Sequence, residues 1–83
     1  MDVAMEIDAR GLLCPLPVLR LRKRIAGLPA GAVVRLIADD PAAAIDVPHF
    51  CAEQGHSFLG AEALPEAPAR DGARPAAYLV RLG

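Results

Sequence analysis

The chain has 83 residues, a formal net charge of −1 and 54% hydrophobic residues, so it can form one small domain with a modest core. The near-neutral charge argues against a general binder of polyanions, and two widely separated cysteines cannot make a disulfide framework. With no apolar signal segment and no run of transmembrane length, we expect a single domain over residues 1–83. We expect it to be soluble and cytoplasmic, with reduced thiols.

The first half of the chain alternates between strand and helix patterns. Hydrophobic side chains at every second position from Val3 to Ala9 predict a half-buried strand. A helix is predicted by apolar residues at spacings of three and four, namely Val18, Leu21, Ile25 and Leu28. Gly27 and Gly31 should end it. Residues 32–38 are almost continuously apolar, as expected for an interior strand.

A second helix should follow directly. Asp40 suits its N-terminal cap and Pro41 its first position. Its predicted apolar face consists of Ala43, Val47, Phe50 and Cys51. Pro48 should kink or break this helix, and Gly55 should cap its end.

The last third of the chain contains two further strand patterns, over residues 56–64 and 76–82, joined by a proline-rich loop over residues 65–75. Two strand–helix units followed by two strands predict an α/β fold of the α+β kind, with the order βαβαββ. In this two-layer sandwich a four-stranded sheet carries both helices on one face.

The stretch Gly11-Leu12-Leu13-Cys14-Pro15-Leu16-Pro17 places a thiol between the first strand and the first helix. Because Cys14 precedes a proline, its backbone is pushed toward the extended conformation of a residue that precedes a helix. The helix can begin at Pro15, with a tight first turn, or at Pro17. Both placements put the thiol near the positive end of the helix.

A thiol at a helix N-terminus ionises more readily, so the sequence predicts a pKa for Cys14 below the ordinary value of about 8.5. Both prolines lack amide hydrogens, which leaves Leu16 and Val18 as the expected donors toward the sulfur. Arg10 should add positive charge beside it. An exposed, partly ionised thiol suits nucleophilic sulfur chemistry, whereas a buried structural cysteine is the alternative.

Cys14-Pro15-Leu16-Pro17, with Lys23 following on the helix, resembles the CPxP signature of the TusA-type (SirA-like) sulfur-carrier family. Residues 38–41 and 46–51 resemble a second block of that family, and a weaker match covers residues 78–82. The resemblance implies a mixed sheet of strand order 1-2-4-3 with an antiparallel last strand.

The same resemblance implies a sulfurtransferase that acts within a relay. Cys14 would accept persulfide sulfur from a cysteine desulfurase or a rhodanese-like donor and pass it to an acceptor sulfurtransferase protein. Pro15, Leu16 and Pro17 would shape the site, and no cofactor would be needed. The best-known destination in the family is 2-thiolation of the tRNA wobble uridine, with only indirect contact to tRNA; molybdenum cofactor synthesis and sulfur oxidation are alternatives. We expect a monomer.

Charged residues are distributed unevenly along the chain. Four cations lie within the five residues Arg20 to Arg24, whereas residues 36–69 contain no Lys or Arg and six carboxylates. Most of these charges can be explained as solvated helix faces. The functional interpretation is a dipolar surface that orients partner proteins, for which the candidate residues are Arg10, Arg20, Lys23 and Asp40.

Four alternative interpretations remain. Cys51 lies on an apolar helix face, so a buried hydrophobic role is favoured over a resolving cysteine. His49, Cys51 and His56 fit no zinc spacing, so no metal is assigned. An RNA-binding module is disfavoured by the charge and by the presence of only three aromatic residues. A thiol redox or regulatory domain would use Cys14 without forming a persulfide.

Overall fold

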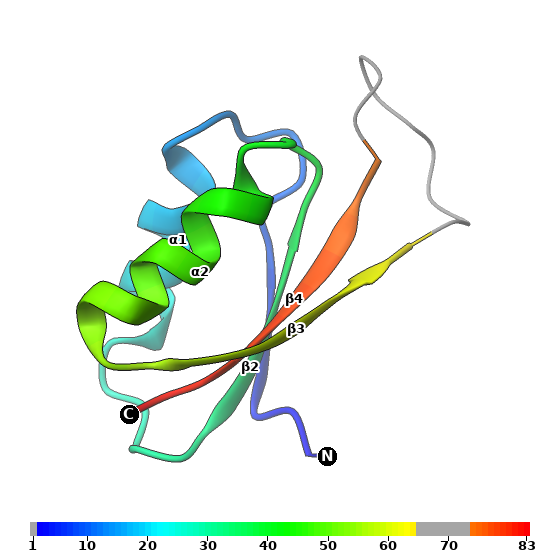
Figure 1. Cartoon of the computed structure of the whole chain (residues 1–83). Coiled ribbons are helices and arrows are strands. Elements are labelled where there is room, and N and C mark those ends of the chain that lie inside the picture. Colours follow the sequence, from blue (N-terminus) through cyan, green and yellow to red (C-terminus); the bar gives the residue numbers. More distant parts are fainter. Residues whose placement is uncertain (1, 65–73) are drawn as a thin grey trace.

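The computed structural model describes residues 2–64 and 74–83, so residues 65–73 of the predicted loop lie outside the described part. The elements are β1 (Met5–Asp8), α1 (Leu16–Ile25), β2 (Val33–Ala38), α2 (Ala43–Gln54), β3 (Ser57–Ala63) and β4 (Ala76–Arg81). The strands form one sheet in the order β1-β2-β4-β3, and both helices cover the same face (Figure 1). β1 pairs parallel with β2, while β4 pairs antiparallel with both of its neighbours. The predicted α+β sandwich and strand order are confirmed.

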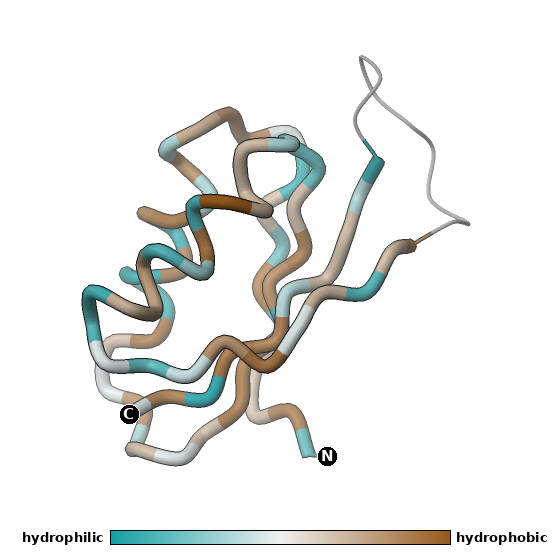
Figure 2. The backbone as a smooth tube through the Cα atoms, viewed as in Figure 1, coloured by the Kyte–Doolittle hydropathy of each residue, from teal (hydrophilic) through white to brown (hydrophobic). Residues whose placement is uncertain are grey.

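The core lies between the sheet and the helix layer. Val34 and Leu36 of the interior strand β2 are fully buried, as are Leu21 of α1 and Val47 of α2. Both helices alternate hydrophobic and hydrophilic residues along their length, as their spacing predicts (Figure 2). Among the described residues, no helix is long and apolar enough to cross a membrane.

Several boundaries differ from the sequence prediction. α1 ends at Ile25, so Leu28, predicted on the apolar stripe of this helix, lies beyond its end. β1 begins at Met5, and Val3 is 41% exposed, because pairing with β2 starts only where the Ala4 amide donates to the Val33 carbonyl. α1 begins at Leu16, between the two predicted starts at Pro15 and Pro17.

The second helix also departs from its prediction. α2 begins at Ala43, and Asp40 does not cap it. Pro48 does not break α2, which continues to Gln54. The amide that Pro48 lacks would have bonded the carbonyl of Ala44, an exposed residue, so water can satisfy that carbonyl. Gly55 ends the helix in the left-handed conformation, with a φ of 76°, as predicted.

The parallel pairing of β1 and β2 brings their carboxyl ends to the same edge of the sheet. Each strand then passes through a short turn into a helix of the same layer (Figure 1). Residues 9–15 after β1 therefore lie beside residues 39–42 after β2. The stretch that contains the thiol is built at this edge.

Candidate functional site

Cys14 is exposed, and it lies in the turn between β1 and α1. The Cys14–Pro15 peptide bond is cis. The Pro15 carbonyl accepts the Leu19 amide in the first turn of α1, at 3.1 Å. Pro17 is buried in that turn, whereas Leu16 is 48% exposed. The two prolines thus fix the backbone beside a sulfur that faces solvent.

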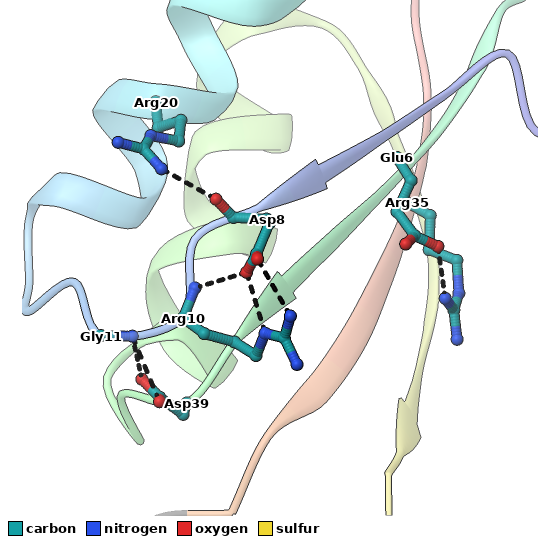
Figure 3. A network of polar contacts seen from close by, with 7 residues as sticks. All are labelled: Glu6, Asp8, Arg10, Gly11, Arg20, Arg35 and Asp39. Atoms are coloured by element: carbon teal, nitrogen blue, oxygen red, sulfur yellow. Dashed lines mark hydrogen bonds and ion pairs between the residues drawn. The ribbon is translucent and has the colours of Figure 1, made fainter. Parts of the chain in front are cut away.

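Two consecutive aspartates after β2 bind the turn that holds Cys14. The buried carboxylate of Asp39 accepts the Gly11 amide, at 3.0 Å and 3.2 Å to its two oxygens (Figure 3). Asp40 accepts the Cys14 amide with Oδ2 and the Ala42 amide with Oδ1. These two amide hydrogen bonds lower the pKa of Asp40 below its ordinary value. We call this pair of side chains the aspartate clamp.

The sulfur itself faces a third carboxylate. Cys14 Sγ donates a hydrogen bond to Asp46 Oδ2, 2.9 Å away, from the first turn of α2. This hydrogen bond, with partial desolvation and the negative charges of Asp46 and Asp40, raises the pKa of Cys14. The sequence prediction of a lowered pKa is therefore wrong.

Two of the groups expected to favour the thiolate, Arg10 and the Leu16 amide, are engaged elsewhere. The Arg10 guanidinium pairs with the Asp8 carboxylate, with Nε to Oδ1 at 2.9 Å, and lowers the Asp8 pKa to about 2 (Figure 3). Arg20 donates to the Asp8 carbonyl at 2.9 Å. The Leu16 amide, an expected donor toward the sulfur, donates instead to the Leu13 carbonyl at 2.8 Å. The helix terminus therefore offers the sulfur less positive potential than predicted.

Two concavities flank the start of α1. A hollow of about 180 Å³ contains the thiol and is lined by Cys14, Pro15, Val18, Asp46, His49, Phe50 and Glu53. A groove of about 570 Å³ follows the other face of α1 and is lined by Leu12, Leu16, Leu19, Arg20, Lys23 and Arg24. The reacting atom and the cationic groove therefore lie on different sides of one helix.

Comparison with known proteins identifies the family. The sequence profile described as "Sulfurtransferase TusA" matches residues 5–67. The chain is 41% identical over 63 residues to the sulfur carrier protein TusA of Pseudomonas syringae pv. syringae (strain B728a), covering 76% of this chain and 75% of the relative. The chain belongs to the TusA family. The matched region contains Cys14, the aspartate clamp and Asp46, so the site lies within the shared part.

Further relatives support the assignment to the TusA family. The sulfur carrier protein TusA of Pseudomonas entomophila (strain L48) is 48% identical over 54 residues, which cover 65% of this chain and 68% of the relative. The crystal structure of a SirA-like protein from Desulfitobacterium hafniense superposes with a TM-score of 0.61 at 28% identity, covering 90% of this chain and 95% of that one. The fold predicted from the sequence is thus the fold of a solved relative.

The remaining sequence candidates are spread over the TusA-family fold. Cys51 is 1% exposed in the core, which confirms the favoured interpretation. His49 lies 3.4 Å from Glu53 at the hollow, and His56 Nδ1 accepts the Gly83 amide at 3.0 Å. The three side chains thus have separate surroundings: His49 pairs with Glu53, His56 with the Gly83 amide, and Cys51 packs in the core.

The carboxylate contacts of the site are not predicted by the sequence, and this includes the hydrogen bond from the Cys14 amide to Asp40. Asp46 belongs to the acidic segment and to the second family block of the sequence, but neither pattern predicts its contact with the sulfur. The hydrogen bond that the Gly11 amide donates to Asp39 is also not predicted by a local pattern. A signal for this last contact exists, because parallel neighbouring strands end at the same sheet edge, so residues directly after them should meet. The contact between Cys14 and Asp46 spans 32 residues and depends on how α2 packs beside α1.

Proposed function

We propose that this TusA-family chain is a sulfur carrier in which Cys14 holds the transferred sulfur as a persulfide. The observation that carries the proposal is an exposed thiol in the CPxP stretch, while the second cysteine is buried. The donor would be a cysteine desulfurase or a rhodanese-like protein, and the acceptor a second sulfurtransferase protein. A small carrier needs a thiol that two partners can reach in turn, and Cys14 is the described thiol that meets this requirement.

The transfer requires no oxidant, reductant or cofactor. The Cys14 sulfur attacks the outer sulfur of the donor's persulfide, and a new S–S bond forms as the donor's own S–S bond breaks. The donor leaves as a thiolate and receives the proton that Cys14 loses. In the next step the acceptor's thiolate attacks the outer sulfur on Cys14 in the same way. Each step exchanges one S–S bond for another, so the two reacting proteins together undergo no net oxidation or reduction. One cysteine on the carrier therefore suffices.

The groove along α1 supports docking of the donor protein. Its leucines are unusually exposed for apolar side chains, with Leu16 at 48% and Leu19 at 49%. Arg20, Lys23 and Arg24 border them. An apolar patch with a cationic rim suits a partner surface that presents hydrophobic residues inside a ring of carboxylates. Arg10, which is paired with Asp8, is a weaker candidate for this role.

The proposed pathway is 2-thiolation of the tRNA wobble uridine, with molybdenum cofactor synthesis and sulfur oxidation as the alternatives. Direct RNA binding receives little support, because Tyr78 and Phe50 are buried in the core and Phe58 is 37% exposed. A redox sensor would use the same exposed thiol, and the mass of the adduct on Cys14 separates a persulfide from a sulfenate or a mixed disulfide.

The test compares the two cysteines. Each variant is incubated with a cysteine desulfurase and free cysteine, and the intact protein is weighed for one added sulfur atom that a reductant removes. Cys14→Ser should gain none. Cys51→Ala should load as the unmodified chain does and lose only about 1 kcal/mol of stability. Loading of Cys14→Ser, or failure of folded Cys51→Ala to load, would reject the single-thiol mechanism.

A further inference from the structure

The contact between Cys14 and Asp46 has a chemical consequence for the free carrier. We propose that Asp46 is a positioning residue that holds the Cys14 sulfur as a neutral thiol in the free protein, so that this exposed cysteine reacts slowly with small electrophiles. The consequence for sulfur transfer rests on the proposed function, because only a carrier benefits from a thiol that reacts mainly when a partner is docked. The protonation state itself does not depend on that function.

The geometry supports this role for Asp46. A distance of 2.9 Å between Sγ and Oδ2 is short enough for the thiol to donate its proton to the carboxylate. Loss of that proton would place a thiolate against a carboxylate at hydrogen-bond distance, where like charges repel. Asp46 is half-buried in the first turn of α2, so the helix fixes the carboxylate relative to the sulfur. The contact therefore favours the neutral thiol.

The other charged groups around the sulfur do not offset this effect. Asp40 binds the Cys14 amide from the turn after β2, and its charge also opposes the thiolate. From α2, Glu53 adds a second carboxylate to the hollow, and His49 is directed to Glu53 at 3.4 Å. From the β1 side, Arg10 is bound to Asp8. The sulfur thus faces mainly acidic groups.

A partner could release the thiol by pairing with Asp46. A lysine, an arginine or an amide donor that binds the carboxylate would remove both the acceptor of the thiol proton and the opposing charge. Because the hollow is open to solvent beside Cys14, a docked protein can reach this carboxylate together with the sulfur. The reactivity of Cys14 would then depend on docking. This suits a thiol that must not react with small molecules in the interval between two partner proteins.

The experiment measures the rate of iodoacetamide labelling of the unloaded 83-residue chain as a function of pH. Labelling is followed by intact mass, with Cys14→Ser as the control for reaction at Cys51. Asp46→Asn and Asp46→Ala should both lower the pH midpoint relative to the unmodified chain. Alanine provides a second variant that favours helix, in case the asparagine variant folds poorly. The matched control is Glu53→Gln, because the Glu53 carboxylate lines the same hollow but pairs with His49 and is not among the groups that act on the Cys14 thiol.

The expected gain in rate can be calculated. For each unit by which the midpoint falls, the thiolate fraction at pH 7 rises about tenfold, while the intrinsic nucleophilicity falls about threefold. The net labelling rate at pH 7 should therefore rise about three- to fourfold per unit. A purely structural role of Asp46 would change stability and leave the midpoint in place.

Two outcomes would overturn the inference. One is an unchanged or higher midpoint in both folded Asp46 variants. The other is a shift in Glu53→Gln as large as in Asp46→Asn, because the effect would then come from the general acidity of the hollow. The labelling assay contains no donor protein. Failure of this inference can therefore be distinguished from failure of persulfide loading, which is measured by mass after incubation with a desulfurase.

Discussion

β1 and β2 run parallel, and each passes at its carboxyl end into a helix of the same layer (Figure 1). The turn after β1 supplies the thiol of Cys14 and leads into α1, whose exposed side carries leucines and cations. The turn after β2 supplies Asp39 and Asp40, and α2 adds Asp46. The two strand–helix units therefore differ in what they supply: the first contains the thiol, and the second supplies carboxylates that bind the backbone around the thiol and its sulfur.

This difference shows how a small fold can orient an exposed cysteine. The first turn has one amide donor fewer because Pro15 lacks one, and Pro17 removes another in the α1 turn that follows. Its conformation depends on carboxylates supplied from the second turn, 26 to 28 residues later in the sequence. Breaking the second turn should therefore disturb the first. The first two changes below test this dependence, and the third, with the smallest expected effect, tests the difference in charge between the two helices.

The largest effect is expected from Asp39→Ala. Asp39 is 8% exposed and its carboxylate accepts the Gly11 amide, so the substitution leaves a partly buried amide without its acceptor. We expect a loss of about 2 kcal/mol in the free energy of unfolding. Urea denaturation followed by circular dichroism measures it. Glu62→Ala, an exposed carboxylate of β3, should change stability by less than about 0.5 kcal/mol. Equal losses in the two variants would contradict the role of the clamp.

The sequence predicted the fold better than it predicted the site. Alternating and helical hydrophobic patterns are local, and Leu21, Val34 and Val47 are buried as those patterns require. The sequence predicts the wrong sign for the Cys14 pKa shift because the groups close to Cys14 in sequence, the helix N-terminus and Arg10, both favour the thiolate. The deciding group, Asp46, is remote in sequence, and no local pattern indicates which carboxylate of an acidic segment will reach the sulfur.

A smaller loss of stability is expected from Asp40→Asn, and the size of this loss should depend on pH. Asp40 holds the Cys14 and Ala42 amides, and its pKa is lowered from 3.8. A carboxylate with a depressed pKa stabilises the folded state above its unfolded pKa, and this contribution is lost as pH falls through the folded value. Asp40→Asn should therefore unfold at lower urea concentration than the unmodified chain at pH 7. The gap between the two midpoints should narrow below pH 3.8.

The urea midpoints of both proteins are measured from pH 7 down to pH 2.5 or so, within the range in which the fold persists, to follow this narrowing. Asp8, whose pKa is lowered to about 2 by Arg10, is present in both proteins, so its own acid dependence cancels in the difference. A gap that stays constant through the acid range would mean that the Asp40 carboxylate does not stabilise the clamp in its ionised form.

The smallest effect tests the difference in charge between the two helices. Lys23 lies on the rim of the α1 groove, so Lys23→Glu should weaken docking of an acidic donor surface without touching Cys14. Persulfide loading by a desulfurase at low salt should slow by roughly three- to tenfold, because rim charges act mainly on the association rate. The difference should shrink at high salt, where exposed charges are screened. Arg81→Glu reverses an exposed cation on β4 and should load at the unmodified rate. If both variants slow equally, the overall charge of the chain and not the α1 groove governs encounter with the donor.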